Sequence, residues 1–307
     1  MAPTPGLSAV PLDAEVAGPQ AAQPSGAPTP GVTAVLRVRN EAHSLPWSLP
    51  QLLRSTDEVL LVDNRSTDDT STIAVEIATR HGLADKLRVV DYPYRLSRCG
   101  PEHLDTPPES AHSLVRYNNW AESLATTSYV VKWDGDMALT RDGERALSAF
   151  GWQVQHRRIN LRLPRHPLYV ESDRVAYLDL AMRNREHFGH PVLPGFSYAK
   201  AFEWEFLLYP EGTPHHNMPE GSCVELKHLD DDEFGHWTDP DAFLTSARTQ
   251  RKRREYMTFD AVRSGDWQQI PGLHRIEAPE GVHVIEYVVE TWLPKAPRPL
   301  DASLAAS

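Results

Sequence analysis

The triplet Asp134-Gly135-Asp136 is the part of the chain whose residue types and spacing most directly allow chemistry. Two carboxylates separated by one residue can share a hard divalent cation, and the glycine between them lets a bulky ligand approach the backbone. Aspartate and glycine also dominate ordinary turns, so the triplet alone is weak evidence. It follows directly on the apolar run over residues 129–133, and this position favours a ligand site at the end of a strand.

Polar residues also follow two earlier apolar runs. The run over residues 32–38 leads into Asn40 and Glu41, and the run over 58–62 leads into a polar block over 63–69 that contains Asp63 and Asp68. The carboxyl ends of parallel strands meet at one edge of a sheet, so these side chains are expected to gather there. Several carboxylates on one rim need a cation or hydrogen-bond donors. A divalent metal and a polar ligand such as a nucleoside would supply both.

The elements that must position these side chains alternate along the chain. Strand patterns over 32–38, 58–63 and 87–92 alternate with helix patterns that begin at 44 and span 70–81. An aperiodic stretch over 93–111 then precedes a helix pattern over 114–126 and the strand at 129–133. This order predicts an α/β fold with parallel strands.

The second half mixes short strands with turns. It contains an aromatic and acidic segment over 202–209, a strand pattern over 224–228, and a helix pattern over 239–256. The basic run over 251–254 could bind phosphate or an anionic membrane, but a short run of this kind more often forms one exposed helix face. Trp152, Trp204, Trp237 and Trp267 could stack on sugar rings, although most large aromatic side chains belong to the core.

Composition excludes several classes of protein. The net charge of -11 argues against a general nucleic-acid binder. Two cysteines are too few for a disulfide framework and lie in no zinc-binding spacing. No apolar run is long enough to span a membrane, and no Lys or Arg precedes Arg37, so neither a transmembrane segment nor a signal peptide is expected. These features predict a cytoplasmic protein.

The motifs together resemble the family 2 glycosyltransferases and their relatives with the GT-A fold. The resemblance covers residues 32–140 and rests on Asn40-Glu41, the block over 62–70, Arg116 and Asn118, and residues 133–136. It implies a Rossmann-like α/β fold with a mixed, mostly parallel central sheet flanked by helices. It also implies a nucleotide-sugar-binding half over 32–140 and an acceptor-binding half of the same domain over 141–293. Residues 1–31, with seven Pro and seven Ala, are expected to form a disordered leader, and 294–307 a flexible tail.

The resemblance also implies roles for particular residues. The donor nucleotide is expected to contact Arg37, Asn40, Glu41, Asp63, Asn64, Ser66, Asp68, Arg116, Asn118 and Asp134. The expected ligands of Mn²⁺ or Mg²⁺ are Asp134, Asp136 and His228. His228 is equally compatible with a surface histidine, and His215, His216 and His236 are weaker alternatives.

A general base is expected in the segment over 202–209, with Glu203 as the first choice and Glu205 as the second. The alternative is an amphipathic helix with solvated glutamates.

The predicted function is therefore a metal-dependent glycosyltransferase of the hexosyltransferase type. It would move a sugar from a nucleoside diphosphate donor to an acceptor hydroxyl or amine, with inversion. One alternative is a sugar-phosphate nucleotidyltransferase, which would be expected to begin with a glycine-rich phosphate loop, whereas residues 32–41 contain no glycine. The other alternative is a protein that binds nucleotide sugars without catalysis.

Overall fold

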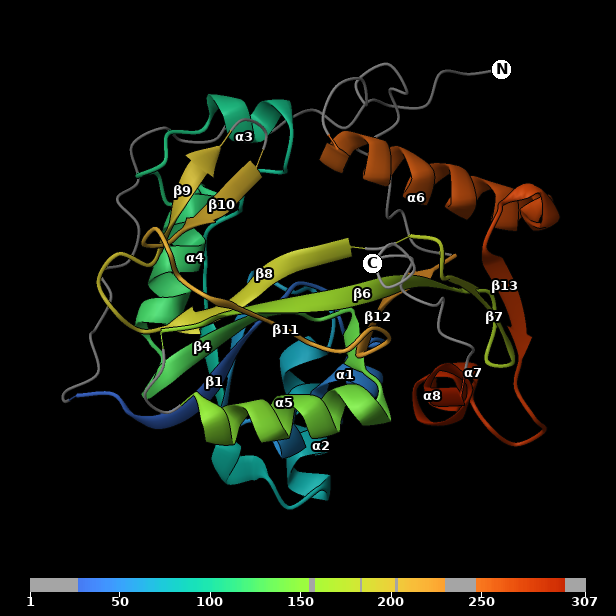
Figure 1. Ribbon diagram of the computed structural model, residues 1–307, viewed down its shortest axis with the longest axis horizontal. Coiled ribbons are helices and arrows are strands. Elements are labelled where there is room, and N and C mark those ends of the chain that lie inside the picture. Colours follow the sequence, from blue (N-terminus) through green and yellow to red (C-terminus); the bar gives the residue numbers. More distant parts are fainter. Residues whose placement is uncertain (1–26, 155–157, 183, 202–203, 230–246, 296–307) are drawn as a thin grey trace, which may run out of the picture.

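The computed structural model describes residues 27–154, 158–182, 184–201, 204–229 and 247–295 (Figure 1). Most of the predicted leader and tail therefore lies outside the described residues. The boundary of the leader at residue 31 is corrected, because strand β1 (Thr29–Val38) begins inside it. The amide N–H of Thr29 donates to the carbonyl of Thr126 at 3.0 Å, and this bond joins the start of β1 to the neighbouring strand.

The first half of the chain forms the parallel part of the central sheet. After β1 come α1 (Leu45–Ser55), β2 (Glu58–Asp63), α2 (Thr70–Arg80), the 3₁₀ helix η1 (Ala84–Lys86), β3 (Leu87–Asp91), α3 (Pro101–Asp105), α4 (Leu114–Ser123) and β4 (Thr127–Asp134). The strands lie in the order β3-β2-β1-β4, and each neighbouring pair is parallel. The predicted alternation of strands and helices is thus confirmed.

The second half extends the same sheet with mostly antiparallel pairs. Its elements are β5 (Met137–Leu139), α5 (Arg141–Gln153), β6 (Asn160–Val170), β7 (Val175–Asp179), β8 (Asn184–Pro191), β11 (His215–Asn217), β12 (Cys223–His228), α6 (Ala247–Ser264), the 3₁₀ helix η3 (Trp267–Gln269), β13 (Leu273–Glu277), α7 (Val284–Tyr287), the π-helix η4 (Val288–Trp292) and α8 (Leu293–Lys295). Strand β8 joins the halves, because it pairs with both β4 and β6. The structure confirms the predicted class, a mixed α/β sheet flanked by helices.

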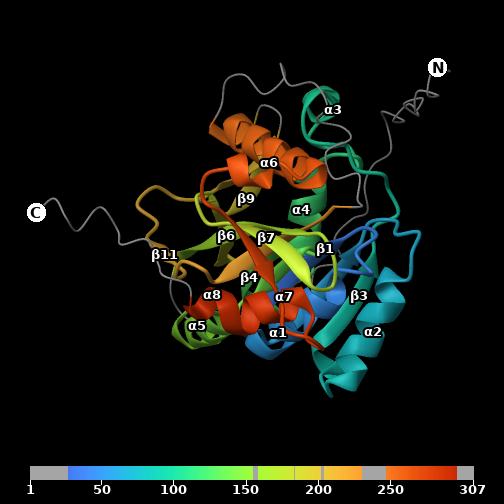
Figure 2. The same cartoon turned by 90° about the vertical axis from the view of Figure 1, so that its right-hand side faces the viewer.

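Helices cover both faces of this sheet (Figures 1 and 2). Helices α4 and α6 lie on one face, and α1, α5 and α7 lie on the other. Alternation along β1 explains how the strand serves both layers, because Val35 packs with α4 residues while Ala34 and Leu36 pack with α1 and α5. The β1 side chains at every second position from Val35, and the β4 side chains on the same face, therefore point toward α4. They include the polar residues described below.

Three sequence interpretations require correction. The stretch over 93–111 contains the short helix α3. Residues 204–208 form strand β10 (Trp204–Leu208), which pairs antiparallel with β9 (Ser197–Ala201), so the amphipathic-helix interpretation is wrong there. Helix α6 continues to Ser264, and the part of its predicted range over 239–246 lies outside the described residues.

The basic run of α6 requires a further correction, because it does not form a single exposed face. Arg251 pairs with Glu186 of β8 at 2.9 Å, and Arg254 pairs with the fully buried Asp179 of β7 at 2.8 Å. Arg253 remains exposed. These pairs attach α6 to the sheet. Among the described residues no helix is both long and apolar enough to cross a membrane.

Candidate active site

Arg37 stands at the centre of a polar cluster on the α4 face of the sheet. It lies opposite Asp134 in the parallel register of β1 and β4, and the two side chains form an ion pair. The other terminal nitrogen, Nη1, donates to Oδ1 of Asn118 in α4 at 2.8 Å. Three of the residues expected to contact the nucleotide thus lie together, although they come from three separate elements.

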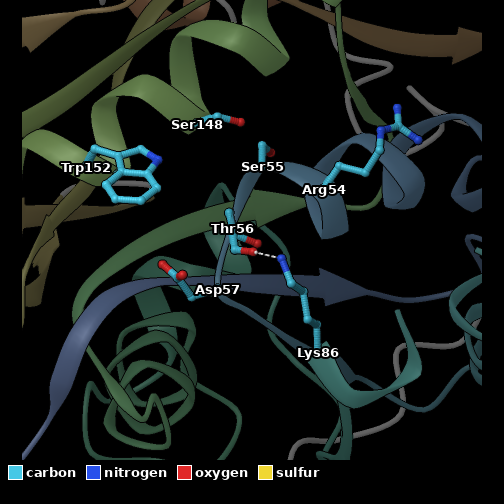
Figure 3. Close-up of a pocket in the computed structure, with 8 residues that line it drawn as sticks. Arg54, Ser55, Thr56, Asp57, Lys86, Ser148 and Trp152 are labelled. Atoms are coloured by element: carbon cyan, nitrogen blue, oxygen red, sulfur yellow. Dashed lines mark hydrogen bonds between the residues drawn. The ribbon is translucent and has the colours of Figure 1, made fainter. Parts of the chain in front are cut away.

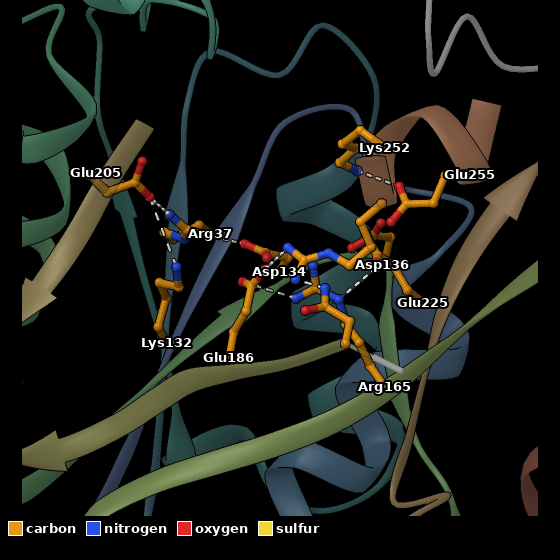
Figure 4. A network of polar contacts seen from close by, with 12 residues as sticks. Arg37, Lys132, Asp134, Asp136, Arg165, Glu186, Glu205, Glu225, Lys252 and Glu255 are labelled. Atoms are coloured by element: carbon orange, nitrogen blue, oxygen red, sulfur yellow. Dashed lines mark hydrogen bonds and ion pairs between the residues drawn. The ribbon is translucent and has the colours of Figure 1, made fainter. Parts of the chain in front are cut away.

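Glu205 closes this cluster from strand β10. Its Oε1 accepts from Nδ2 of Asn118 at 3.1 Å and lies 4.0 Å from Arg37 Nη1 and 3.9 Å from Lys132 Nζ. Its side chain is only 10% exposed. The second oxygen, Oε2, is buried and has no hydrogen-bond partner among the described residues, and Figure 4 shows it pointing away from Arg37 and Lys132. Glu203, the first choice for the general base, lies outside the described residues.

Asp136 is held against strand β12. Its backbone carbonyl accepts from the N–H of Leu226 at 2.8 Å, and its Oδ2 lies 3.3 Å from Nζ of Lys227. Lys227 is 2% exposed and also pairs with Oε1 of Glu225 at 2.8 Å. Glu225 in turn pairs with Nε of Arg165 from β6 at 2.6 Å. The aspartate triplet is therefore the end of a chain of ion pairs that reaches into the sheet (Figure 4).

Sequence reasoning missed several charged residues of this network. They are Lys132, Arg165, Glu186, Glu225 and Lys227. The available signal was a charged residue at alternate positions of an apolar strand, as in Val224-Glu225-Leu226-Lys227. Such alternation places the charges together on one face of the strand, but the sequence does not show which face carries the site.

The charges of the network shift the pKa values of its acids in opposite directions. Burial alone would raise the pKa of Asp134, but the positive charges of Arg37 and Lys132 outweigh it and hold that pKa below its ordinary value. Burial and then the negative charge of Asp136 raise the pKa of Glu41 to about 9. Glu41 also packs directly on Gly135, where an added Cβ would lie 2.6 Å from Cγ of Glu41. A side chain at position 135 would therefore force Glu41 to move.

The expected metal ligands are partly gathered. Asp134 and Asp136 offer the carboxylate oxygens that Mn²⁺ and Mg²⁺ prefer, although Arg37 and Lys227 also contact them. Within the described ranges, no three His, Cys, Asp or Glu side chains are grouped so that they could hold a metal ion. Mg²⁺ is often bound by one or two carboxylates together with substrate phosphates, so an incomplete protein shell still fits such a cofactor.

His228 lies away from the Lys227 side of strand β12. Successive side chains of a strand point to opposite faces, and the ring of His228 packs edge-on against His43 with the centroids 4.3 Å apart. Its role as a metal ligand stays a prediction.

The remaining polar residues at the strand ends shape two neighbouring loops. Asn40, at φ 57°, accepts the N–H of Thr67 on Oδ1 at 2.7 Å, and its own N–H donates to Oγ of Ser66 at 2.9 Å. Oδ1 of Asp63 accepts the N–H of Ser66 at 2.8 Å. Similar bonds join Asp68 to the N–H of Ala42 at 3.1 Å, and Asn64 to the carbonyl of Tyr94 at 2.6 Å. These bonds fix the rim of the site, while the predicted nucleotide contacts of the same residues stay predictions.

Arg116 lies on α4 two residues before Asn118, and its positive charge acts on the hydroxyl of Tyr92. Two residues along a helix correspond to about 200° of rotation, so Arg116 and Asn118 point in different directions. The predicted contact of Arg116 with the nucleotide stays a prediction.

Comparison with known proteins yields only distant structural likenesses. No family model matches the chain, and no curated protein matches it. S. aureus TarS 1-349 is 20% identical, with 46% of this chain and 36% of that chain covered and a TM-score of 0.30. The mannosyltransferase PcManGT from Pyrobaculum calidifontis, in complex with GDP-Man and Mn²⁺, is 24% identical over 48% and 39% of the two chains, with a TM-score of 0.27.

Glucosyl-3-phosphoglycerate synthase from Mycobacterium tuberculosis, in complex with Mn²⁺, UDP and phosphoglyceric acid, is 20% identical over 45% and 43% of the two chains, with a TM-score of 0.26. This chain therefore spans less than half the length of each of these three proteins. At such TM-scores the likenesses carry no conclusion about its activity.

Proposed function

We propose that this chain is a metal-dependent glycosyltransferase of the family 2 type with the GT-A fold. It would move a hexosyl group from a nucleoside diphosphate donor to a hydroxyl or amine of an acceptor, with inversion. The observation that carries the proposal is the position of Glu205, which lies on the other side of Arg37 from Asp134 and Asp136 (Figure 4). Its carboxylate is positioned by Asn118, is nine-tenths buried, and has one oxygen that no described residue satisfies.

An unsatisfied buried carboxylate oxygen is costly unless a ligand donates to it. An acceptor hydroxyl is such a donor, and Glu205 would take its proton as the acceptor oxygen attacks the anomeric carbon of the donor sugar. The bond between that carbon and the diphosphate oxygen breaks in the same step, and the nucleoside diphosphate leaves with the bonding electrons. Attack from the side opposite the leaving group inverts the configuration.

The aspartates and the cations around them would serve the leaving group. Asp134 and Asp136 would hold Mn²⁺ or Mg²⁺, which supplies positive charge to a departing diphosphate when it is bound. Arg37 and Lys227 orient the two carboxylates through the contacts described above. The resemblance over residues 32–140 supports the same assignment and implies that the nucleotide would contact Arg37, Glu41 and Asp63.

The substitution Asp136→Asn tests this proposal. It keeps the size of the side chain and the backbone bond to Leu226, but it removes the charge that a cation needs. We expect Mn²⁺-dependent binding of UDP or GDP, measured by calorimetry, to be lost, and donor turnover with a panel of acceptors to fall by about 100-fold or more. Asp85→Asn, at an exposed position of η1 away from the ends of the parallel strands, is the matched control.

Full turnover by the Asp136→Asn variant would refute the site assignment. Binding of nucleoside diphosphates by the wild type without any transfer would instead favour a non-catalytic binding protein. Product formed from a sugar phosphate and a nucleoside triphosphate would favour a nucleotidyltransferase.

A further inference from the structure

A cavity of about 250 Å³ lies at the opposite edge of the sheet from the candidate active site. Its walls come from the end of α1, the turn before β2, η1 and the last turns of α5 (Figure 3). The residues that matter for the argument are Arg54, Asp57, Lys86, Ser148, Gly151 and Trp152. Asp57 directly precedes β2, whereas the candidate active site follows the last residue of that strand. The length of β2 therefore separates the two sites by about 20 Å.

Trp152 forms an open aromatic wall of this cavity. Its side chain is 82% exposed, which is the highest value for a large hydrophobic residue among the described parts of the chain. An indole left in water contributes little to stability, yet it offers a flat apolar face with a polar N–H at its edge. Gly151 beside it adds no side chain to the cavity. The exposed ring is therefore available to a ligand that has an apolar face of its own.

Two polar groups of the cavity have hydrogen-bonding capacity left for a ligand. Oδ2 of Asp57 accepts the N–H of Val32 at 2.8 Å, and this bond fixes the carboxylate. Its other oxygen, Oδ1, has no partner among the described residues. The hydroxyl of Ser148 donates to the carbonyl of Glu144 at 2.9 Å, which leaves its lone pairs free to accept. The cavity thus presents acceptors next to an aromatic face.

The two cations of the cavity are already engaged. Arg54 makes two bonds of 2.8 Å to the carboxylate of Glu144. Nζ of Lys86 donates to the carbonyls of Leu53 and Thr56 at 3.1 Å and 2.8 Å. Glu144 and Asp57 together balance the charges of Arg54 and Lys86, so the cavity has no net positive charge to attract a phosphate or other anion.

We propose that this cavity binds a neutral saccharide. A sugar ring has an apolar C–H face that would stack on Trp152, and it carries hydroxyl groups that would donate to Asp57 and Ser148. The cavity is small, so it would hold one ring and leave the rest of a longer glycan in solvent. The site is separate from the candidate active site and does not depend on the proposed function.

Saturation-transfer NMR on the full chain tests the proposal with glucose, mannose, N-acetylglucosamine, maltose and cellobiose as probes. We expect at least one of these sugars to bind with a Kd on the order of 1 mM. Trp152→Ala should weaken that binding by about tenfold or more, because it removes the aromatic anchor. Asp57→Asn should also weaken it, while the amide oxygen can still accept the N–H of Val32. Val75→Ala, at an exposed position on α2, is the matched control.

The proposal is overturned if none of the five sugars binds, or if Trp152→Ala and Asp57→Asn bind them as the wild type does. Stronger binding of inorganic phosphate than of any sugar would also overturn it. Calorimetry with UDP and GDP shows whether a loss of sugar binding comes from this cavity or from the active site. Trp152→Ala and Asp57→Asn should both bind nucleotide as the wild type does.

Discussion

At the scale of single residues, Arg37 organises the candidate active site. Its guanidinium bonds Asn118 and Asp134, and it lies 4.0 Å from Glu205. An arginine is always charged and carries five donors in a planar fork, so one side chain can orient several acceptors at once. Arg37 therefore ties together the two carboxylates to which we assign different tasks, Asp134 for the metal and donor and Glu205 for the acceptor.

The base assignment predicts different effects for two glutamates. Glu205→Gln should keep the bond to Asn118 but cannot take a proton, so we expect kcat to fall by about 100-fold or more while donor affinity is unchanged. Glu203→Gln is the comparison, because the sequence pattern favours Glu203. Steady-state kinetics together with calorimetry of donor binding would measure both quantities. If Glu203→Gln loses turnover and Glu205→Gln keeps it, the base is Glu203 and our reading of the structure is wrong.

The sequence was sufficient to place part of this site. Asp134 was predicted from the end of an apolar strand, whereas Arg37 and Asn118 were predicted from the family resemblance. The parallel register of β1 and β4 places Arg37 beside Asp134, and a hydrogen bond joins Arg37 to Asn118. Lys227 and Arg165 were not identified, because a charge inside an apolar strand gains its meaning from strands far away in the chain. The pairing of β12 with both β5 and β6 decides those contacts, and no local pattern predicts it.

At the scale of elements, the N-terminus of α5 packs closely against the residue that precedes strand β12. The hydroxyl of Thr140 accepts the N–H of Gly143 at 3.1 Å, and this bond caps the helix. A Cβ on Gly143 would lie 1.9 Å from the carbonyl oxygen of Ser222, next to β12. The absence of a side chain at Gly143 thus allows α5 to pack against the start of β12, the strand that carries Lys227.

Two glycines of this helix predict opposite effects on stability. Gly143→Ala should lower the free energy of unfolding by about 1–3 kcal/mol, because the methyl group meets a backbone atom that cannot move aside alone. Gly151→Ala, in the same helix, places its Cβ at an ordinary 3.5 Å from Val32 Cγ2. It should raise the free energy of unfolding by about 0.5–1 kcal/mol through helix propensity. Urea unfolding followed by circular dichroism measures both, and equal effects would contradict the close packing of Gly143.

At the scale of the whole molecule, a buried pair joins the first half of the chain to the second. His190 of β8 and Glu122 of α4 approach to 3.0 Å between Nε2 and Oε2, while Nδ1 of His190 lies 3.1 Å from the carbonyl of Pro191. Both ring nitrogens thus face acceptors, which favours the doubly protonated imidazolium. Burial opposes that charge, but Glu122 outweighs it and raises the pKa of His190 above its ordinary value.

The stability of the folded chain should therefore depend on pH through this pair. A histidine with a raised pKa in the folded state contributes stability that is fully present below its unfolded-state pKa and is lost as pH rises through the folded-state pKa. Glu122→Gln keeps an acceptor but removes the charge, so it should lower the free energy of unfolding by about 2 kcal/mol at acidic pH near 5.5. The loss should shrink when the pH is raised to about 9, because the imidazole gives up its proton as pH rises through the folded-state pKa.

Urea unfolding of the wild type and the variant at the two pH values would measure this difference. Glu144→Gln is the matched control, because its partner Arg54 stays charged at both pH values and its effect should not change between them. A Glu122→Gln effect that is the same at both pH values would show that His190 does not change its charge between them and would contradict the prediction. An effect that grows with pH would show that burial, and not Glu122, sets the charge of the histidine.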